Sequence, residues 1–119
     1  MLMGVKIKRI YEPYSENDGF RVLVDRLWPR GINKEKAHID KWMKEVAPST
    51  VLRKWFNHEP DKWEQFRIKY HTELKDSPAL KELFSYINEN KTVTFLFGSK
   101  EERYNHAIVL QQFITNHFL

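Results

Sequence analysis

The chain has 119 residues, a length that suits one domain over residues 1–119. It has 20 lysine and arginine residues against 16 aspartate and glutamate residues, so its net charge is +4. It contains no cysteine, which excludes disulfides, thiolate nucleophiles and cysteine-ligated metal centres. No apolar stretch is long enough for a transmembrane helix, and charge follows the first residues too soon for a signal peptide, so we expect a cytoplasmic protein.

Three segments have the patterns of β-strands. Residues 5–11 alternate apolar and charged side chains, as a half-buried strand does. Residues 20–28 have a continuous apolar centre and residues 92–98 are equally apolar, which is typical of strands buried on both faces and usually parallel. The connection between the first two strands is only about eight residues long, which is short for a parallel crossover, so a hairpin of these strands is the alternative.

Five segments carry apolar residues at the helical spacing of 3.6. Their stripes are Ile39, Trp42, Met43 and Val46; Leu52, Trp55 and Phe56; Trp63, Phe66, Tyr70 and Leu74; Leu80, Leu83, Phe84 and Ile87; and Leu110, Phe113, Ile114 and Phe118. Ser49, Pro60 and the Ser77-Pro78 pair are typical of helix starts. We therefore expect the α/β class, with a small, mainly parallel three-stranded sheet covered by helices in a single domain.

Charged residues gather where the predicted strands end, which is where open parallel sheets bind ligands. Asp25, Arg26 and Arg30 follow the second strand, and Arg9 lies near the end of the first. Because the planar guanidinium binds carboxylate or phosphate through two hydrogen bonds, the arginines predict an anion site. Asp25 would orient a guanidinium or act as a base. The alternative is an internal Asp–Arg pair that fixes the loop.

The segment after the third predicted strand lies at the same edge of the sheet. Free N–H groups at the start of the last helix favour an anion, and Asn105 is a ligand-binding candidate there. His58 and His106 are candidates for proton transfer, with a ring bonded to the backbone as the alternative. Trp28 and Trp55 would form apolar walls. No histidine or carboxylate spacing is typical of a metal site, so we expect neither metal nor cofactor.

Four segments also resemble a known family. They are residues 9–13, 19–31, 47–58 and 105–110, and the second contains the string Val-Asp-Arg-Leu-Trp-Pro-Arg-Gly. By these motifs the chain is similar to the YeaO-like uncharacterised proteins, which belong to the bacterial family catalogued as domain of unknown function 488. The resemblance implies a small cytoplasmic prokaryotic α/β protein and supplies no reaction.

The broader family carries an Asp-Val-Arg-like string after one strand and a Cys-His-Arg-like string after another. Asp25-Arg26 resembles the first, and Asn105-His106 stands where the second would fall, without a cysteine. Three positions depart from the YeaO-like pattern: Phe97 stands where that pattern has Tyr, Glu101 where it has Asp, and Tyr104 where it has His. These departures speak against acid–base chemistry beside the third strand, whereas the arginine side matches.

The sequence predicts a pocket for a small anionic molecule at the strand ends. Whether the protein is also an enzyme, of a reaction that the sequence does not assign, stays open. The alternative is a nucleic-acid-binding or regulatory interaction module without catalysis, which the charge of +4 and exposed aromatic residues would serve. Acidic and basic residues interleave along most of the chain, which speaks against nucleic acid as the partner. We expect no membrane partner, and a monomer or a homodimer.

Overall fold

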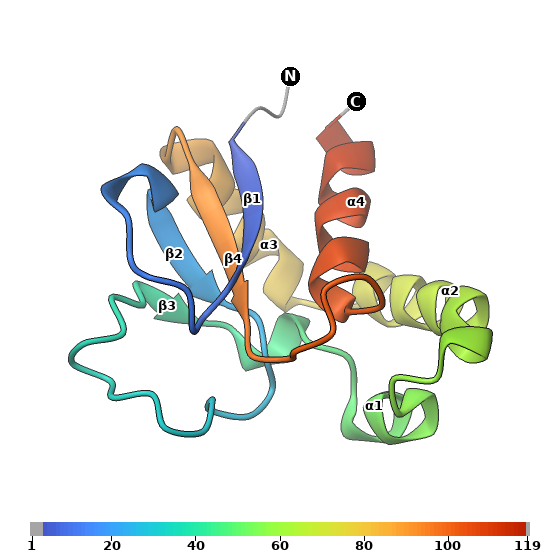
Figure 1. The fold of residues 1–119 in the computed structure, drawn as a ribbon. Helices are drawn as coiled ribbons and strands as arrows, with labels where there is room; N and C mark the ends of the chain where they lie inside the picture. Colours follow the sequence, from blue (N-terminus) through green and yellow to red (C-terminus); the bar gives the residue numbers. More distant parts are fainter. Residues whose placement is uncertain (1–3, 119) are drawn as a thin grey trace.

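The strands of the computed structural model form one parallel sheet (Figure 1). The structure describes residues 4–118. Within this range, four strands pair in the order β1-β4-β2-β3, with β1 at Val5–Arg9, β2 at Phe20–Leu23, β3 at Lys41–Trp42 and β4 at Val93–Phe97. The expected α/β class and parallel pairing are confirmed, and the sheet has one strand more than predicted.

The additional strand, β3, lies where the first helix was predicted. That prediction is wrong, because Lys41–Trp42 pairs with β2 and Lys44–Val46 forms only a 3₁₀ turn. The Met43 N–H extends the pairing by donating to the Leu23 carbonyl at 2.9 Å. Met43 and Val46 are fully buried, so the apolar spacing does indicate burial. The backbone conformation here is fixed by the edge of the sheet and not by helical periodicity.

The first two strands do not form a hairpin, because β4 lies between them and pairs with both in parallel. Residues 10–19 therefore return from the end of β1 to the start of β2 across one face of the sheet. Below them, the Thr94 hydroxyl donates to the Asp18 carbonyl at 2.6 Å. Gly19 closes this connection with a φ of +67°, and a Cβ there would lie 2.2 Å from the Thr92 carbonyl oxygen. Only glycine fits this close approach.

The helices within residues 4–118 are α1 (Thr50–Phe56), α2 (Trp63–Lys75), α3 (Ala79–Glu89) and α4 (His106–Phe118). The predicted starts of α1 and α2 are confirmed, since Ser49 caps α1 and Pro60 begins the 3₁₀ turn that leads into α2, and α3 begins directly after the Ser77-Pro78 pair. The last four predicted helices therefore follow local sequence chemistry. No helix in the described range is long and apolar enough to span a membrane.

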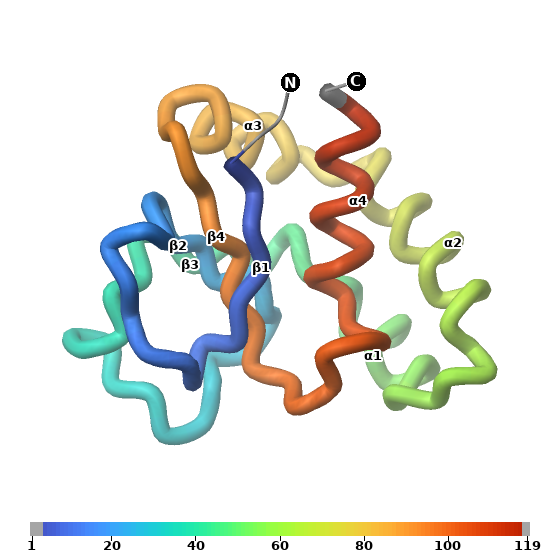
Figure 2. The backbone as a smooth tube through the Cα atoms, turned by 45° about the horizontal axis from the view of Figure 1, so that its top comes forward, coloured from blue at the N-terminus to red at the C-terminus, as the bar shows by residue number. Residues whose placement is uncertain are grey.

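Successive residues of β4 point to opposite faces of the sheet. Phe95 packs into the main core with the apolar sides of the helices, whereas Leu96 packs with Ile10 and Leu23 in a smaller cluster. Figures 1 and 2 show the irregular segments 10–19 and 24–40 on the side of the molecule away from α4 and α2. Because all strands run the same way, their carboxyl ends meet at the lower edge in Figure 1.

Candidate functional site

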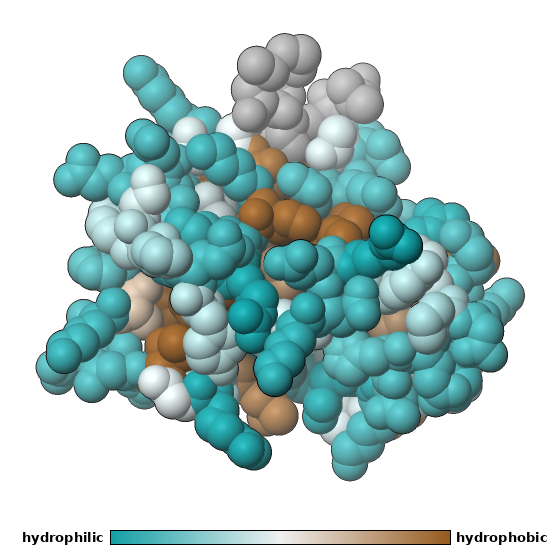
Figure 3. Space-filling view, viewed as in Figure 1, coloured by the Kyte–Doolittle hydropathy of each residue, from teal (hydrophilic) through white to brown (hydrophobic). Residues whose placement is uncertain are grey.

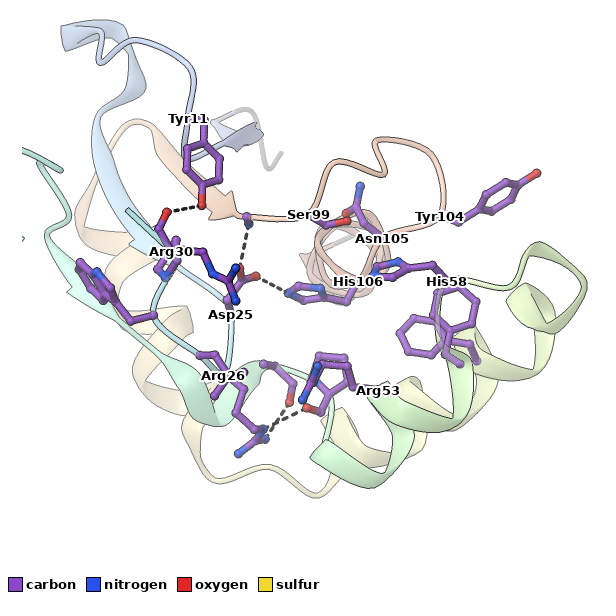
Figure 4. A pocket seen from close by; sticks show the side chains of 18 residues that line it. Tyr11, Asp25, Arg26, Arg30, Arg53, His58, Ser99, Tyr104, Asn105 and His106 are labelled. Atoms are coloured by element: carbon purple, nitrogen blue, oxygen red, sulfur yellow. Dashed lines mark hydrogen bonds and ion pairs between the residues drawn. The ribbon is translucent and has the colours of Figure 1, made fainter. Parts of the chain in front are cut away.

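A cavity of about 290 Å³ lies beyond the carboxyl ends of β2 and β4. Its walls come from the loop after β2, the segment before α1, α1 itself and the β4–α4 loop (Figure 4). Asp25, Arg26, Arg30, Asn105 and His106 all line it. The structure therefore brings together the two groups of residues that parallel strand ends predict to be neighbours.

Asp25 joins the loops that follow the two central strands. Its Oδ2 accepts a hydrogen bond of 2.8 Å from the Gly98 N–H, and a Cβ at Gly98 would approach this oxygen to 3.1 Å. None of the ion pairs of the described residues links Asp25 to an arginine. The prediction that Asp25 orients a guanidinium is therefore wrong, and so is the alternative of an internal Asp–Arg pair. Asp25 is instead held by a backbone N–H and faced by an imidazole. Its negative charge therefore lies at one side of the cavity and is not paired with an arginine.

His106, in the first turn of α4, faces Asp25. Its Nε2 lies 2.9 Å from the Val24 carbonyl oxygen and 3.2 Å from Asp25 Oδ1. Because a carbonyl oxygen only accepts, Nε2 must carry the proton. That proton is directed to Val24, and Asp25 Oδ1 is buried without a hydrogen bond. The ring is bonded to the backbone, as in the alternative weighed for this histidine.

Tyr70 lies below His106, with the two ring centres 6.3 Å apart. It is fully buried, and its hydroxyl donates to the Val46 carbonyl. Burial, followed by the charges of Glu73 and Asp25, raises the pKa of Tyr70 well above its usual value. The phenol therefore stays a hydrogen-bond donor and fixes the position of the 3₁₀ turn beneath the cavity.

Arg26 holds the segment that precedes α1. Its Nε donates to the Pro48 carbonyl at 3.0 Å and its Nη2 to the Ala47 carbonyl at 3.1 Å, as the dashed lines in Figure 4 show. Both acceptors are neutral, so they satisfy the N–H groups and leave the positive charge uncancelled. Arg26 therefore positions one wall of the cavity while it contributes charge to it.

Arg30 and Arg53 line the cavity from different elements, Arg30 from the loop after β2 and Arg53 from α1. Both residues are exposed, and neither guanidinium has a hydrogen bond or ion pair to another residue within 4–118. The Arg30 backbone is fixed, because its carbonyl accepts a hydrogen bond of 2.7 Å from the Tyr11 hydroxyl. The lining thus contains three arginines and one aspartate, a net charge of +2 when its histidines are neutral.

His58 enters the cavity from the turn after α1. Asn57 and His58 have φ values of +47° and +54°, which are uncommon for residues other than glycine. Figure 4 shows the His58 ring directed towards Asn105 and His106. The nearby Glu101 accepts hydrogen bonds from two backbone N–H groups, which together with the charge of His58 lower its pKa. Asn57 is the left-handed C-cap of α1, with its N–H bonded to the Arg53 carbonyl, so this turn ends the helix and brings His58 to the cavity wall.

Two predicted site residues lie elsewhere. Arg9 Nε donates to the Ser99 carbonyl at 2.9 Å, and its guanidinium stacks over the Tyr11 ring, so it supports the β4–α4 loop from outside the cavity. Trp55 lies on the outer surface of α1, with two lysine ammonium groups each 5.1 Å from its ring centre. Trp28 does line the cavity, and its indole N–H donates to Ile32.

Of the residues on the α1 side of the cavity, the sequence analysis predicted His58 but missed the others. There Arg53 and Phe56 form the wall together with Phe66 of α2. Helical spacing explains Phe56 and Phe66 as core residues, and only the packing of α1 against α2 shows that they also face the cavity. No group of three or more histidine, aspartate or glutamate residues in the described part of the chain could hold a metal ion.

These features define a class of protein, a parallel α/β domain with an arginine-lined cavity at its strand ends. The chain belongs to the DUF488 family, since residues 4–119 match the family model described as the inactive DUF488-N3 subclade. The resemblance to YeaO-like proteins is thereby confirmed.

Curated relatives match along nearly their whole length. The uncharacterized protein YeaO of Escherichia coli is 40% identical over 114 residues, which is 96% of this chain and 99% of that protein. The uncharacterized protein Rv3073c of Mycobacterium tuberculosis is 41% identical over 111 residues, 93% of each chain. No solved structure matches the chain.

Proposed function

We propose that this protein is a cytoplasmic binding protein that holds a small anionic molecule in the cavity at its strand ends and does not turn it over. The observation that carries the proposal is the excess of arginine in the lining, where Arg30 and Arg53 have no carboxylate partner within the described residues. A guanidinium has five N–H donors in a fixed plane, and an anion would satisfy those that face the cavity.

Two features support binding without catalysis. Asp25 is the carboxylate of the lining, and its oxygens face the Gly98 N–H and His106, so it is poorly placed as a base for a ligand. The matching family model is described as inactive, and the chain has no cysteine to serve as a nucleophile. Asp25, His58 and His106, the candidates for catalysis, would then shape and polarise the binding site.

The test is the affinity of single-arginine variants for phenyl phosphate, measured by isothermal titration calorimetry. Arg30→Ala and Arg53→Ala should each weaken binding roughly ten- to a hundred-fold, because each removes a charged hydrogen-bond donor worth about 1.5–3 kcal/mol. Thermal unfolding should be nearly unchanged, since neither side chain has a partner within the described structure.

Lys54→Ala is the matched control, because Lys54 is an exposed cation next to Arg53 on α1 and does not line the cavity. It should keep the affinity of the unmodified protein. Absence of binding by any small anion at millimolar concentration would refute the proposal, and so would equal losses in Lys54→Ala and Arg53→Ala.

A further inference from the structure

We infer that the cavity is built for a doubly charged, tetrahedral oxyanion carried on an apolar group, the chemistry of a phosphate monoester. This inference rests on the proposed function and names its ligand class. It is carried by the charge of the lining, the directions from which the arginines come, and the apolar wall beside them.

The lining as a whole carries an excess of positive charge. Three arginines and one aspartate leave +2 when the histidines are neutral, and the aspartate is held by the Gly98 N–H away from the arginines. A singly charged ligand would leave a positive charge uncancelled inside a partly enclosed site, where charges are screened less than in water. A dianion matches the lining.

Two of the arginines reach the cavity from different elements. Arg30 comes from the loop after β2 and Arg53 from α1, and Figure 4 shows them on different walls. A planar carboxylate offers two oxygens along one edge, which suits a single guanidinium. A phosphate monoester offers three terminal oxygens that point in different directions, so it can accept from both arginines at once.

The β4–α4 loop adds a third source of positive potential. Asn105 and His106, at the start of the 13-residue helix α4, line the cavity, so the positive end of the helix dipole faces it. Asn105 is itself occupied, because its side chain bonds the backbone of Glu101, Glu102 and Ile108. It therefore fixes the loop and the helix start, and the arginines remain the ligand-binding donors.

The remaining wall is apolar. Leu27, Pro29, Pro48, Phe56 and Phe66 line the same cavity as the arginines. Inorganic phosphate would leave this surface in contact with water, whereas an organic group attached to the phosphate would cover it. The ligand therefore has an anionic end for the arginines and an apolar end for this wall.

The experiment compares three probes with the full chain at about pH 8, where a phosphate monoester is a dianion because its second pKa is about 6. Phenyl phosphate and phenyl sulfate have the same ring and a tetrahedral head group, but the sulfate carries a single charge. Inorganic phosphate has the double charge and no ring. Calorimetry should give an affinity for phenyl phosphate about ten-fold higher than for either of the other probes.

Arg53→Gln should remove most of the preference for phenyl phosphate over phenyl sulfate, while Lys54→Gln should keep it. Equal binding of the two phenyl probes, both weakened by Arg53→Gln, would overturn the dianion inference and leave the proposed function standing. Equal binding of inorganic phosphate and phenyl phosphate would overturn the apolar part. If none of the probes binds, the proposed function fails with the inference.

Discussion

Asp18 is the best example of a single residue that organises several segments. It is buried and pairs with Lys8 at 2.9 Å and with the buried Arg21. Arg21 also donates to the His38 carbonyl at 2.9 Å and to the Ala37 carbonyl at 3.2 Å. The network therefore ties both irregular segments on this face to β1 and β2. Removing one member of such a buried pair leaves the other charge uncompensated.

The network predicts that Asp18 stabilises the fold at neutral pH and less so in acid. Burial opposes ionisation, but hydrogen bonds from Lys8, the Ser15 N–H and Arg21 hold the pKa of Asp18 below its ordinary value. A carboxyl whose pKa is lowered in the folded state stabilises the fold at pH values above its unfolded-state pKa. This contribution is lost as the pH falls through the folded-state pKa. Asp18→Asn should cost about 3–5 kcal/mol at neutral pH, measured by urea unfolding, and less in acid.

Glu16→Gln is the control for this prediction, because Glu16 is exposed in the same 3₁₀ turn. Its effect should stay within about 0.5 kcal/mol. A cost for Asp18→Asn that is equally small, or that is unchanged between neutral and acidic pH, would show that the network does not stabilise the fold.

For the helices and strands, the sequence predictions are correct where an element depends on local interactions and wrong where it depends on residues distant in the sequence. The starts of α1 and α2 depend on Ser49 and Pro60, whose effects are local, so they can be read from the sequence. β3 depends on pairing with β2, which is distant in sequence, and Trp42 fits a helical stripe equally well. For the same reason the sequence does not predict Arg53 as a cavity residue, since the position of its side chain depends on how α1 packs against α2.

β2, one of the two central strands, should be sensitive to loss of volume. Leu23 is fully buried in the smaller cluster and lies opposite Leu96 and Trp42 of the two neighbouring strands. Leu23→Ala should therefore lower the free energy of unfolding by about 2–5 kcal/mol. Leu27→Ala is the control, because Leu27 is 63% exposed four residues further along. Similar unfolding midpoints for the two variants in urea would contradict a buried β2.

At the scale of the whole molecule, hydrophilic side chains cover most of the face drawn in Figure 3, with a brown apolar band between β1 and α4. The net charge of +4 is modest. Lysines lie over the rings of three tryptophans, at 5.6 Å for Trp28, 4.8 Å for Trp42 and 5.1 Å for Trp55. These rings are therefore partly covered, whereas a platform for nucleic-acid bases needs open ring faces.

Nucleic-acid binding is the rival function for this protein. The protein should show no sequence-specific binding to DNA or RNA at an ionic strength of about 0.15 M. Weak binding at low salt would come from counterion release alone, so its log affinity should fall with log salt by about 0.9 for each duplex phosphate neutralised and should not depend on sequence. Fluorescence anisotropy with two unrelated labelled oligonucleotides, single- and double-stranded, at about 0.05 M and 0.2 M salt separates these cases. Arg30→Ala should reduce this weak binding only slightly, because the cavity would not be the site of nucleic-acid binding. Sub-micromolar binding that differs between the two sequences at the higher salt would favour the nucleic-acid module over the anion-binding protein.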